Sequence, residues 1–365
     1  MKILIITNSS PGTYMFRREL VEELLKENTV ILASPDGLHF DDFEKMGCKT
    51  VKTDLDRHGM NIFRELKLKS EYERIIVGEK PDVVLTFTVK PNLYATPICR
   101  GENIPCIVNV AGLGTPYEKG GIIKNCFLKI YLSSLKKAAI VFFQNSSVKK
   151  VFTDHGLPED KCFLLPGSGV NTEFFEYRSY PREEEKTVFL LAGRIVKDKG
   201  IEEFLCCAKK IKEKYPNTVF EVAGEAESEE YDKTIEKAVS DGVIKFLGFI
   251  DDMRPIYENA WAVVVPSYHE GLSNVCLEAA ASGRVVIASD IPGCREAVED
   301  GKTGLLFEQK NGDALVKAVE KFLLLPYDNK VEMGVEGRKK VKKEFDRQIV
   351  VEEYCEKIKN QLCLF

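Results

Sequence analysis

Short apolar runs alternate with longer amphipathic segments along the whole chain. In the first half, runs rich in Val, Ile and Leu have the length of buried strands. We expect strands at Ile3–Thr7, Thr29–Ala33, Thr50–Thr53, Asp82–Thr86, Pro105–Val110, Ala139–Phe143 and Cys162–Leu165. Helical periodicity lies between them and is clearest in Tyr14–Lys26 and Ile62–Gly78. This alternation predicts a parallel sheet covered by helices.

The alternation restarts after a polar interruption. We expect further strands at Thr187–Leu191, Val219–Ala223, Ile244–Leu247, Ala262–Val265 and Val285–Ser289, and helices at Ile201–Lys214, Glu229–Ser240, Asn274–Ser282 and Asp313–Leu325. The periodicity lapses in Pro166–Asn171 and again in Tyr177–Lys186, which indicates a hinge. The chain is therefore expected to form two doubly wound α/β domains, residues 1–168 together with 346–365 and residues 169–345, and the charged tail, Glu336–Lys359, is expected to form helices that pack on the surface.

Composition narrows the class of protein. The net charge of -5 divides unevenly: residues 1–168 hold 23 Lys+Arg and 20 Asp+Glu, a net of +3, and the remainder holds 29 and 37, a net of -8. The acidic half argues against nucleic-acid binding. Eleven cysteines without a Cys-x-x-Cys pair predict neither a disulfide framework nor a zinc ribbon and favour a reduced, cytoplasmic protein. No uncharged apolar run approaches the ~20 residues of a membrane span, so any membrane association is expected to be peripheral.

Two acids in the second half are placed for ligand binding. Glu270 lies in a turn after an apolar strand, and Glu278 lies about one helical turn inside the helix that Ser273 can cap. Both carboxylates can face one cleft. The free N–H groups at the start of this helix attract anions such as a diphosphate.

Two cations follow an earlier strand of the same half. The segment Ala192–Gly200 contains Gly193, Arg194 and Lys199 in a glycine turn. Arg binds two phosphate oxygens with its planar guanidinium, and Lys adds a mobile positive charge. The alternative is a surface ion pair with Asp198 or Glu202. Together with Glu270 and Glu278, the cations predict a sugar-nucleotide site.

These motifs resemble those of the retaining glycosyltransferases of family four. The resemblance rests on a glycine-bearing first loop, Gly-Arg-(x4)-Lys-Gly, Phe246-Leu-Gly248-Phe249 and Glu-x7-Glu, in that order along the chain. It implies the GT-B fold of two facing Rossmann-like domains, with a C-terminal helix that crosses back to the first domain. Three shorter segments, beginning at Asp56, Phe87 and Asn109, resemble bacterial enzymes that extend sugars on undecaprenyl diphosphate.

The resemblance implies a role for each matching residue. It assigns leaving-group stabilisation to Arg194 and Lys199, donor-sugar contacts to Glu270, and the ribose hydroxyls to Glu278. The remaining donor-site candidates are Gly12, Gly248, Phe249, Ile250, Gly271, Leu272, Ser273 and Asn274, and the acceptor-site candidates are Arg17, Arg18, Arg57, Asn61 and Lys90. No residue is identified as a nucleophile for double displacement.

The function expected is retaining transfer of a hexose or N-acetylhexosamine from a UDP-sugar to a lipid-linked saccharide in surface polysaccharide assembly. Asp54-Leu-Asp56 has the Asp-x-Asp form of a metal site but no second signal supports it, so no metal or other cofactor is expected. A sugar-nucleotide 2-epimerase of the same fold and a non-catalytic nucleotide-sugar-binding partner are the alternatives.

A basic segment gives the first domain a candidate membrane surface. Lys119–Thr153 holds seven lysines and no acidic residue. Apolar residues recur in it at helical spacing, at Ile123, Phe127, Ile130, Tyr131, Leu135 and Ala138. Most of this stripe is expected to pack on the sheet, as in an ordinary crossover helix. The exposed lysines could attract anionic lipid on the inner face of the cell membrane.

Overall fold

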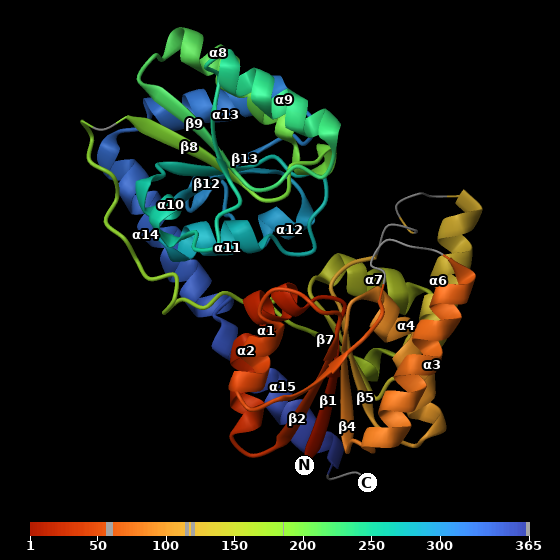
Figure 1. The fold of residues 1–365 in the computed structure, drawn as a ribbon. Helices are drawn as coiled ribbons and strands as arrows, with labels where there is room; N and C mark the ends of the chain where they lie inside the picture. The colour runs from red at the N-terminus through yellow and green to blue at the C-terminus, as the bar shows by residue number, and fades with distance from the viewer. Residues whose placement is uncertain (56–60, 114–116, 118–120, 185, 363–365) are drawn as a thin grey trace. The chain divides into compact units, whose positions relative to one another are not determined.

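A computed structural model describes residues 1–55, 61–113, 117, 121–184 and 186–362. The chain divides into two compact units, residues 1–168 with 348–365 and residues 169–347. Each unit is a parallel sheet with helices on both of its faces (Figure 1). Both therefore have the doubly wound α/β architecture that the alternating pattern predicts.

The first unit contains a seven-stranded parallel sheet. Its strands are β1 (Lys2–Ile6), β2 (Thr29–Ser34), β3 (Lys49–Lys52), β4 (Val83–Phe87), β5 (Cys106–Val110), β6 (Ile140–Phe143) and β7 (Cys162–Leu164). They lie in the order β3-β2-β1-β4-β5-β6-β7, so the winding direction reverses between β1 and β4. Strands β4, β5 and β6 are buried along their whole length, as expected of a sheet covered on both faces.

In the described part of this unit, seven α-helices cover the sheet. They are α1 (Ser10–Leu25), α2 (Phe40–Lys45), α3 (Ile62–Glu79), α4 (Val89–Gly101), α6 (Gly121–Leu135), α7 (Ser146–Asp154) and the C-terminal α15 (Arg347–Leu362). Helices α1, α2 and α15 lie on one face and α3, α4, α6 and α7 on the other (Figure 1). Tyr354 of α15 is buried against the rings of Phe87 and Phe142 and accepts a hydrogen bond from the Asn109 amide, 2.8 Å. This contact confirms the predicted return of the C-terminal helix, but the expectation that the tail packs on the surface is wrong, because Tyr354 belongs to the first unit's core.

The second unit has a six-stranded parallel sheet. Its strands are β8 (Thr187–Ala192), β9 (Thr218–Ala223), β10 (Lys245–Gly248), β11 (Ala262–Val265), β12 (Val285–Ser289) and β13 (Gly304–Phe307), in the order β10-β9-β8-β11-β12-β13. The winding reverses between β8 and β11. Ligands of doubly wound sheets bind beyond the carboxyl ends of the strands at such a point.

Helices also cover both faces of this second sheet. They are α8 (Ile201–Lys214), α9 (Glu229–Ser240), α10 (Arg254–Asn259), α11 (Asn274–Ala281), α12 (Pro292–Arg295), α13 (Gly312–Leu324) and α14 (Tyr327–Glu344). Helices α8, α9 and α13 share one apolar core, α10, α11 and α12 share the other, and α14 contributes to both (Figure 1).

The two segments that connect the units lie against each other. Val170 N–H donates to Phe345 O, 2.9 Å, and Arg347 N–H donates to Val170 O, 2.9 Å. Gly169 has φ +65°, and a Cβ at this position would lie 2.6 Å from Arg347 Cα. This contact requires glycine because a side chain could not fit between the two segments.

Two details of the predicted elements are wrong. Strand β13 was not expected, and α1 begins at Ser10 rather than Tyr14 because the Ser9 hydroxyl accepts a hydrogen bond from Gly12 N–H, 3.1 Å. On α6, Tyr131 and Leu135 are buried as expected, but Ile123 and Ile130 are 54% and 58% exposed. In the described part of the chain, no helix is both long and apolar enough to traverse a bilayer.

Candidate functional site

The candidate site is built at the switch point of the second sheet. Lys199 follows β8 in a short 3₁₀ turn (Lys197–Lys199), and Glu270 follows β11. Gly200, with φ +73°, allows the two segments to meet, because a Cβ there would lie 2.1 Å from Pro266 O. Tyr268 N–H donates to Asp198 O, 2.8 Å, and joins the same segments again. The backbone thus fixes the two loops against each other.

Lys199 and Glu270 form an ion pair across this junction. Lys199 Nζ lies 2.6 Å from Glu270 Oε1, and the side chains are 26% and 14% exposed. The Ser267 hydroxyl donates to the same Oε1, 2.8 Å. The structure therefore brings together two residues that are 71 positions apart and were predicted to share one site. A cation and a carboxylate in contact with solvent at a switch point can bind a phosphate and a sugar hydroxyl.

The loop that carries Glu270 is packed tightly against α12 and α11. A Cβ on Gly293 would lie 2.5 Å from Glu270 O, so α12 lies directly against the Glu270 backbone. Ser273 caps α11: its hydroxyl accepts from Cys276 N–H, 3.4 Å. Its own N–H donates to Gly293 O, 3.1 Å, so this donor is occupied within the protein. The expected phosphate contact of the Ser273 N–H therefore does not fit the unliganded geometry. Leu272 is buried, whereas Gly271 and Asn274 are partly exposed at the helix start.

Arg194 lies after β8, on the same sheet edge, and is paired with a different acid. Its guanidinium forms an ion pair with Glu227, and the two side chains are 62% and 45% exposed. Neither Asp198 nor Glu202, the partners considered from sequence, forms this contact. Exposed pairs of this kind contribute at most ~1 kcal/mol, so a phosphate can displace Glu227 at little cost.

Glu278 sits half-buried on α11 and is held by a tyrosine that sequence reasoning missed. Tyr257 OH donates to Glu278 Oε2, 2.8 Å. Burial raises the pKa of Glu278 to about 7, against the opposing effects of the Tyr257 hydrogen bond and the charge of Arg347. Tyr257 lies 21 residues earlier on α10, and no spacing rule relates it to the Glu-x7-Glu motif.

The segment after β10 contains the candidates for reading the base. Gly248 has φ +69°, and its carbonyl accepts from Gly224 N–H, 2.8 Å. Phe249 is 59% exposed, and Ile250 is partly buried against the core beneath α10 and α11. An exposed aromatic ring at a strand exit is available to contact a planar base.

In the first unit, three candidates lie on α1, Gly12 near its start and Arg17 and Arg18 near its middle. Gly12 belongs to the first turn of this helix, not to a preceding loop. Arg17 is 7% exposed, and its guanidinium carbon lies 5.0 Å from the centre of the Phe87 ring. Arg18 is bound to Glu19 and Glu22 at 3.7 and 3.5 Å. Arg17 and Arg18 are thus held by protein groups, and their acceptor roles remain predictions.

The other acceptor candidates belong to α3 and α4. Asn61 caps α3 by accepting from Phe63 N–H, 3.0 Å. Lys90 Nζ lies 2.5 Å from Glu65 Oε1 and joins α4 to α3, and Tyr94 OH donates to the other oxygen of Glu65, 2.7 Å. Arg57 lies outside the described residues.

Across the described residues, no group of three or more His, Cys, Asp or Glu side chains is arranged to hold a metal ion. Asp54, from the Asp-x-Asp sequence considered above, forms an ion pair with Lys67, 2.7 Å.

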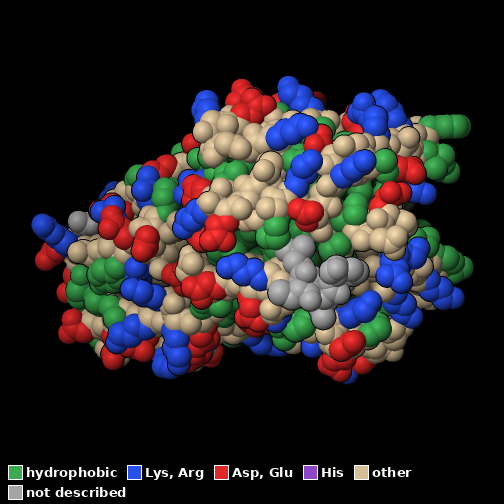
Figure 2. Space-filling view, turned by 90° about the horizontal axis from the view of Figure 1, so that it is seen from below, with side chains coloured by type: hydrophobic (Ala, Val, Ile, Leu, Met, Phe, Trp, Pro, Cys, Tyr) green, Lys and Arg blue, Asp and Glu red, His purple; other side chains and the backbone are tan. Residues whose placement is uncertain are grey.

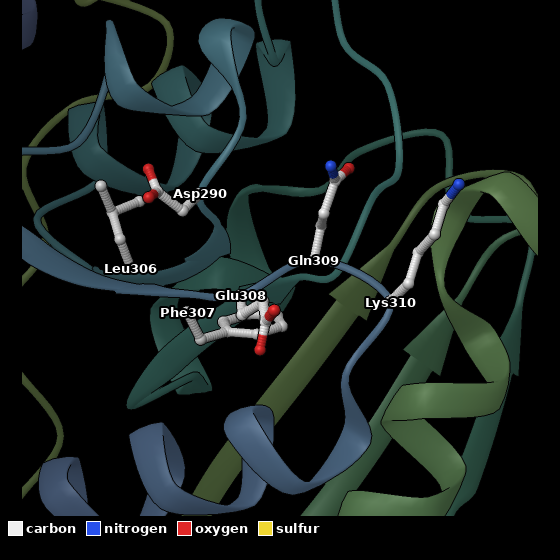
Figure 3. A pocket seen from close by; sticks show the side chains of 6 residues that line it. All are labelled: Asp290, Leu306, Phe307, Glu308, Gln309 and Lys310. Atoms are coloured by element: carbon white, nitrogen blue, oxygen red, sulfur yellow. The ribbon is translucent and has the colours of Figure 1, made fainter.

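A pocket of about 450 Å³ lies at the same edge of the second sheet. Its lining comes from the residue after β12 and from the end of β13 and the segment that follows: Asp290, Leu306, Phe307, Glu308, Gln309 and Lys310 (Figure 3). It contains none of the predicted site residues. Lys310 links it to the Glu270 loop, because its ammonium lies 4.8 Å from the centre of the Tyr268 ring.

Comparison with known families accounts for both units. The model "Glycosyl transferase 4-like" matches residues 2–145, and "Glycosyl transferases group 1" matches residues 173–340. The chain belongs to the family-four glycosyltransferases. Its two parallel sheets are the GT-B fold of this family, and the resemblance seen in the motifs is confirmed.

Relatives of this glycosyltransferase match it over nearly its full length. An N,N'-diacetylbacillosaminyl-diphospho-undecaprenol alpha-1,3-N-acetylgalactosaminyltransferase of Campylobacter jejuni is 25% identical, with 97% of each chain covered. The capsular polysaccharide biosynthesis glycosyltransferase CapM of Staphylococcus aureus is 27% identical, with 96% of this chain and 95% of CapM covered. The crystal structure of Anabaena HepE in complex with UDP and glucose has a TM-score of 0.83 at 16% identity and covers 99% of this chain and 100% of HepE. At that identity the likeness concerns the fold.

Proposed function

We propose that this glycosyltransferase transfers a hexose or N-acetylhexosamine from a UDP-sugar, with retention and without a metal ion, to a saccharide linked to undecaprenyl diphosphate. The observation that carries the proposal is the Lys199–Glu270 pair, 2.6 Å apart at the switch point of the second sheet. The second unit would bind the donor nucleotide sugar, and the first unit would bind the acceptor. Two relatives named for lipid-linked and capsular sugar transfer support this choice of acceptor.

In this proposal, the donor diphosphate separates the ion pairs of the unliganded site. Lys199 leaves Glu270, Arg194 leaves Glu227, and both cations take the phosphate oxygens on which negative charge grows. Glu270 is then free to accept hydrogen bonds from donor-sugar hydroxyls. The bond between the anomeric carbon and the phosphate oxygen breaks, and a bond forms from that carbon to the acceptor hydroxyl oxygen. The hydroxyl proton passes to the departing phosphate, so the protein needs no dedicated base.

The first unit also has a surface suited to the membrane that carries such an acceptor. Ile62, Phe63 and Leu66 at the start of α3 are 73%, 83% and 60% exposed, and Ile122 at the start of α6 is 82% exposed. Both helices follow strands of the sheet, so both N-terminal ends lie at its carboxyl edge. Figure 2, which is seen from the amino-end side of this sheet, shows hydrophobic side chains interspersed with Lys, Arg, Asp and Glu side chains on the near face.

This surface combines two sources of membrane affinity. Lys129, which lies on α6 itself, is exposed and contributes about 1 kcal/mol near anionic lipid, whereas Lys136 and Lys137 follow the C-terminal end of α6 at the opposite edge of the sheet. Exposed Ile and Phe side chains gain free energy when they enter the interface between headgroups and acyl chains. We therefore propose peripheral binding to the cytoplasmic face of the cell membrane through α3 and α6.

A panel assay tests the proposed reaction. The protein is offered labelled UDP- and GDP-sugars with undecaprenyl-diphosphate-linked saccharides, with and without EDTA. We expect transfer from one UDP-sugar, an α-linked product from an α-linked donor by NMR, and the same rate with EDTA. Loss of transfer with EDTA would refute metal independence. Interconversion of a UDP-sugar without an acceptor would indicate the 2-epimerase, and UDP binding with no turnover would indicate a non-catalytic binding partner.

A further inference from the structure

Tyr257 is a fully buried tyrosine whose hydroxyl contacts the candidate ribose ligand. Its side chain has no exposed surface, and its OH lies 2.8 Å from Glu278 Oε2. The Phe175 ring packs edge-on against it, with the ring centres 6.0 Å apart. Helix α10 thus directs a fixed donor to a carboxylate carried by α11.

We infer that Tyr257 is a positioning residue for nucleotide binding, which holds the Glu278 carboxylate in one orientation and in the ionised form that accepts both ribose hydroxyls. The inference rests on the proposed function, because it requires Glu278 to bind the ribose. A ribose presents two neighbouring hydroxyl donors. An ionised carboxylate has about four acceptor sites, so it can accept both hydroxyls and the Tyr257 hydroxyl, whereas a protonated carboxyl has become a donor on one oxygen.

The Tyr257 hydrogen bond matters for ribose binding because the surroundings of Glu278 disfavour its ionised form. Burial raises the pKa of Glu278 to about 7, so its ionised form is only partly populated near neutral pH. The pKa of the Tyr257 hydroxyl is held well above its ordinary value, first by burial and then by the charge of Glu278. Tyr257 therefore keeps its proton and remains a donor wherever Glu278 titrates.

Few other ionisable groups act on this carboxylate. Among the residues that the structure describes, Tyr257 on α10 and Arg347 beyond α14 influence Glu278, and both favour its ionised form. Cys276, on the same helix as Glu278, acts on Tyr257. UDP affinity should therefore increase as the pH rises through 7 and decrease as the pH falls below 7, because Glu278 binds the ribose in its ionised form.

The test measures UDP binding by calorimetry from pH 6 to pH 9. The wild type is compared with Tyr257→Phe and Glu278→Gln. The Glu278→Gln profile serves as the baseline, because it contains the titration of the UDP phosphate but not that of Glu278. Loss of the hydroxyl should move the Glu278 transition upward by about one pH unit. At pH 7 the ionised fraction then drops from about one half to about one tenth, so Tyr257→Phe binds UDP about fivefold more weakly. At pH 9, where Glu278 is ionised in both proteins, the difference should become much smaller, because only the loss of orientation then separates the two proteins.

A second buried tyrosine provides the control. Tyr354→Phe removes a buried hydroxyl that accepts from Asn109 in the first unit, and it should leave the pH profile of UDP binding unchanged. Equal weakening of Tyr257→Phe at every pH, or no change at any pH, would overturn the inference and leave the proposed function intact. If Glu278→Gln binds UDP as tightly as the wild type, both the ribose role and the inference fail. Should Tyr257→Phe not fold, the wild type must still lose affinity below pH 7 relative to Glu278→Gln.

Discussion

Replacing Gly200 with Ala perturbs the junction that holds Lys199 beside Glu270. Gly200 has φ +73°, and an added Cβ would lie 2.1 Å from Pro266 O. Contacts of Cβ atoms below 3.0 Å are essentially never found, so the segments after β8 and β11 must separate by at least 3.0 − 2.1 = 0.9 Å. The backbone conformation is also one that alanine disfavours.

The magnitude has two parts. The left-handed conformation costs alanine ~1–2 kcal/mol, partly offset by ~0.4–1 kcal/mol from the stiffer unfolded chain. Forcing extra volume into a packed site adds ~1–3 kcal/mol. We expect Gly200→Ala to lower the free energy of unfolding by ~2–4 kcal/mol. For a unit of this size each kcal/mol moves Tm by ~2–4 °C, so a decrease in Tm of roughly 5–12 °C is expected.

The same displacement should reduce catalysis. Moving Lys199 by about 0.9 Å relative to Glu270 changes the geometry in which the two groups meet the donor. A misplacement of ~1 Å commonly costs ~100-fold in rate. We expect kcat/KM for sugar transfer to fall by about this factor at a temperature where the variant is folded.

Gly301→Ala is the matched control. Gly301 has φ +75°, nearly the same as Gly200, but a Cβ there would meet no atom within 4 Å. This variant should show only the conformational cost, ~1 kcal/mol, with activity within about twofold of the wild type. If Gly200→Ala has the Tm and activity of Gly301→Ala, the close approach does not position the site, and the argument is refuted.

Two further predictions concern the carboxylate and the membrane surface. Glu270→Gln should lower kcat ~100-fold with a Tm change of at most ~2 °C. The control Glu320→Gln, which removes a lysine-paired acid on α13, should retain full activity. Equal rates in both variants would contradict the role of Glu270. The double variant Phe63→Ser with Ile122→Ser should reduce co-sedimentation with anionic vesicles ~30–1000-fold, because each side chain contributes ~1–2 kcal/mol when inserted. Val77→Ser with Val239→Ser, at residues each 43% exposed near the C-terminal end of α3 and on α9, should bind like the wild type, and identical partitioning of the two double variants would exclude insertion through the N-terminal ends of α3 and α6.

The sequence predicted well those features that depend on local pattern. Twelve of the thirteen strands follow from apolar runs, and Lys199 meets Glu270 because parallel strands place their exits at one edge. Strand β13 was missed because Gly304-Leu-Leu-Phe307 is short and begins with glycine. On α6 the apolar positions are too numerous for one face, so periodicity alone did not separate buried Tyr131 from exposed Ile130.

Side-chain partners that depend on packing could not be predicted. Tyr257 reaches Glu278 because α10 packs beside α11, and no residue spacing encodes that contact. Arg194 pairs with Glu227 and not with the acids that are near it in sequence. Glu227 follows β9, which lies beside β8 in the sheet. The Ser273 N–H was expected to be free at a helix start, but Gly293 brings its carbonyl close enough to accept it.

The contribution of residues 348–365 to the first unit sets the order in which the two lobes can be completed during synthesis. Residues 169–347 are contiguous, so the second lobe has its full sequence before the ribosome reaches Tyr354. The first lobe, although translated earlier, must wait for the last helix to cover Phe87 and Phe142 and to meet Asn109. A fragment ending at residue 168 would leave the Phe87 and Phe142 rings exposed to water, and a stable isolated first lobe therefore requires the terminal helix to be joined to it.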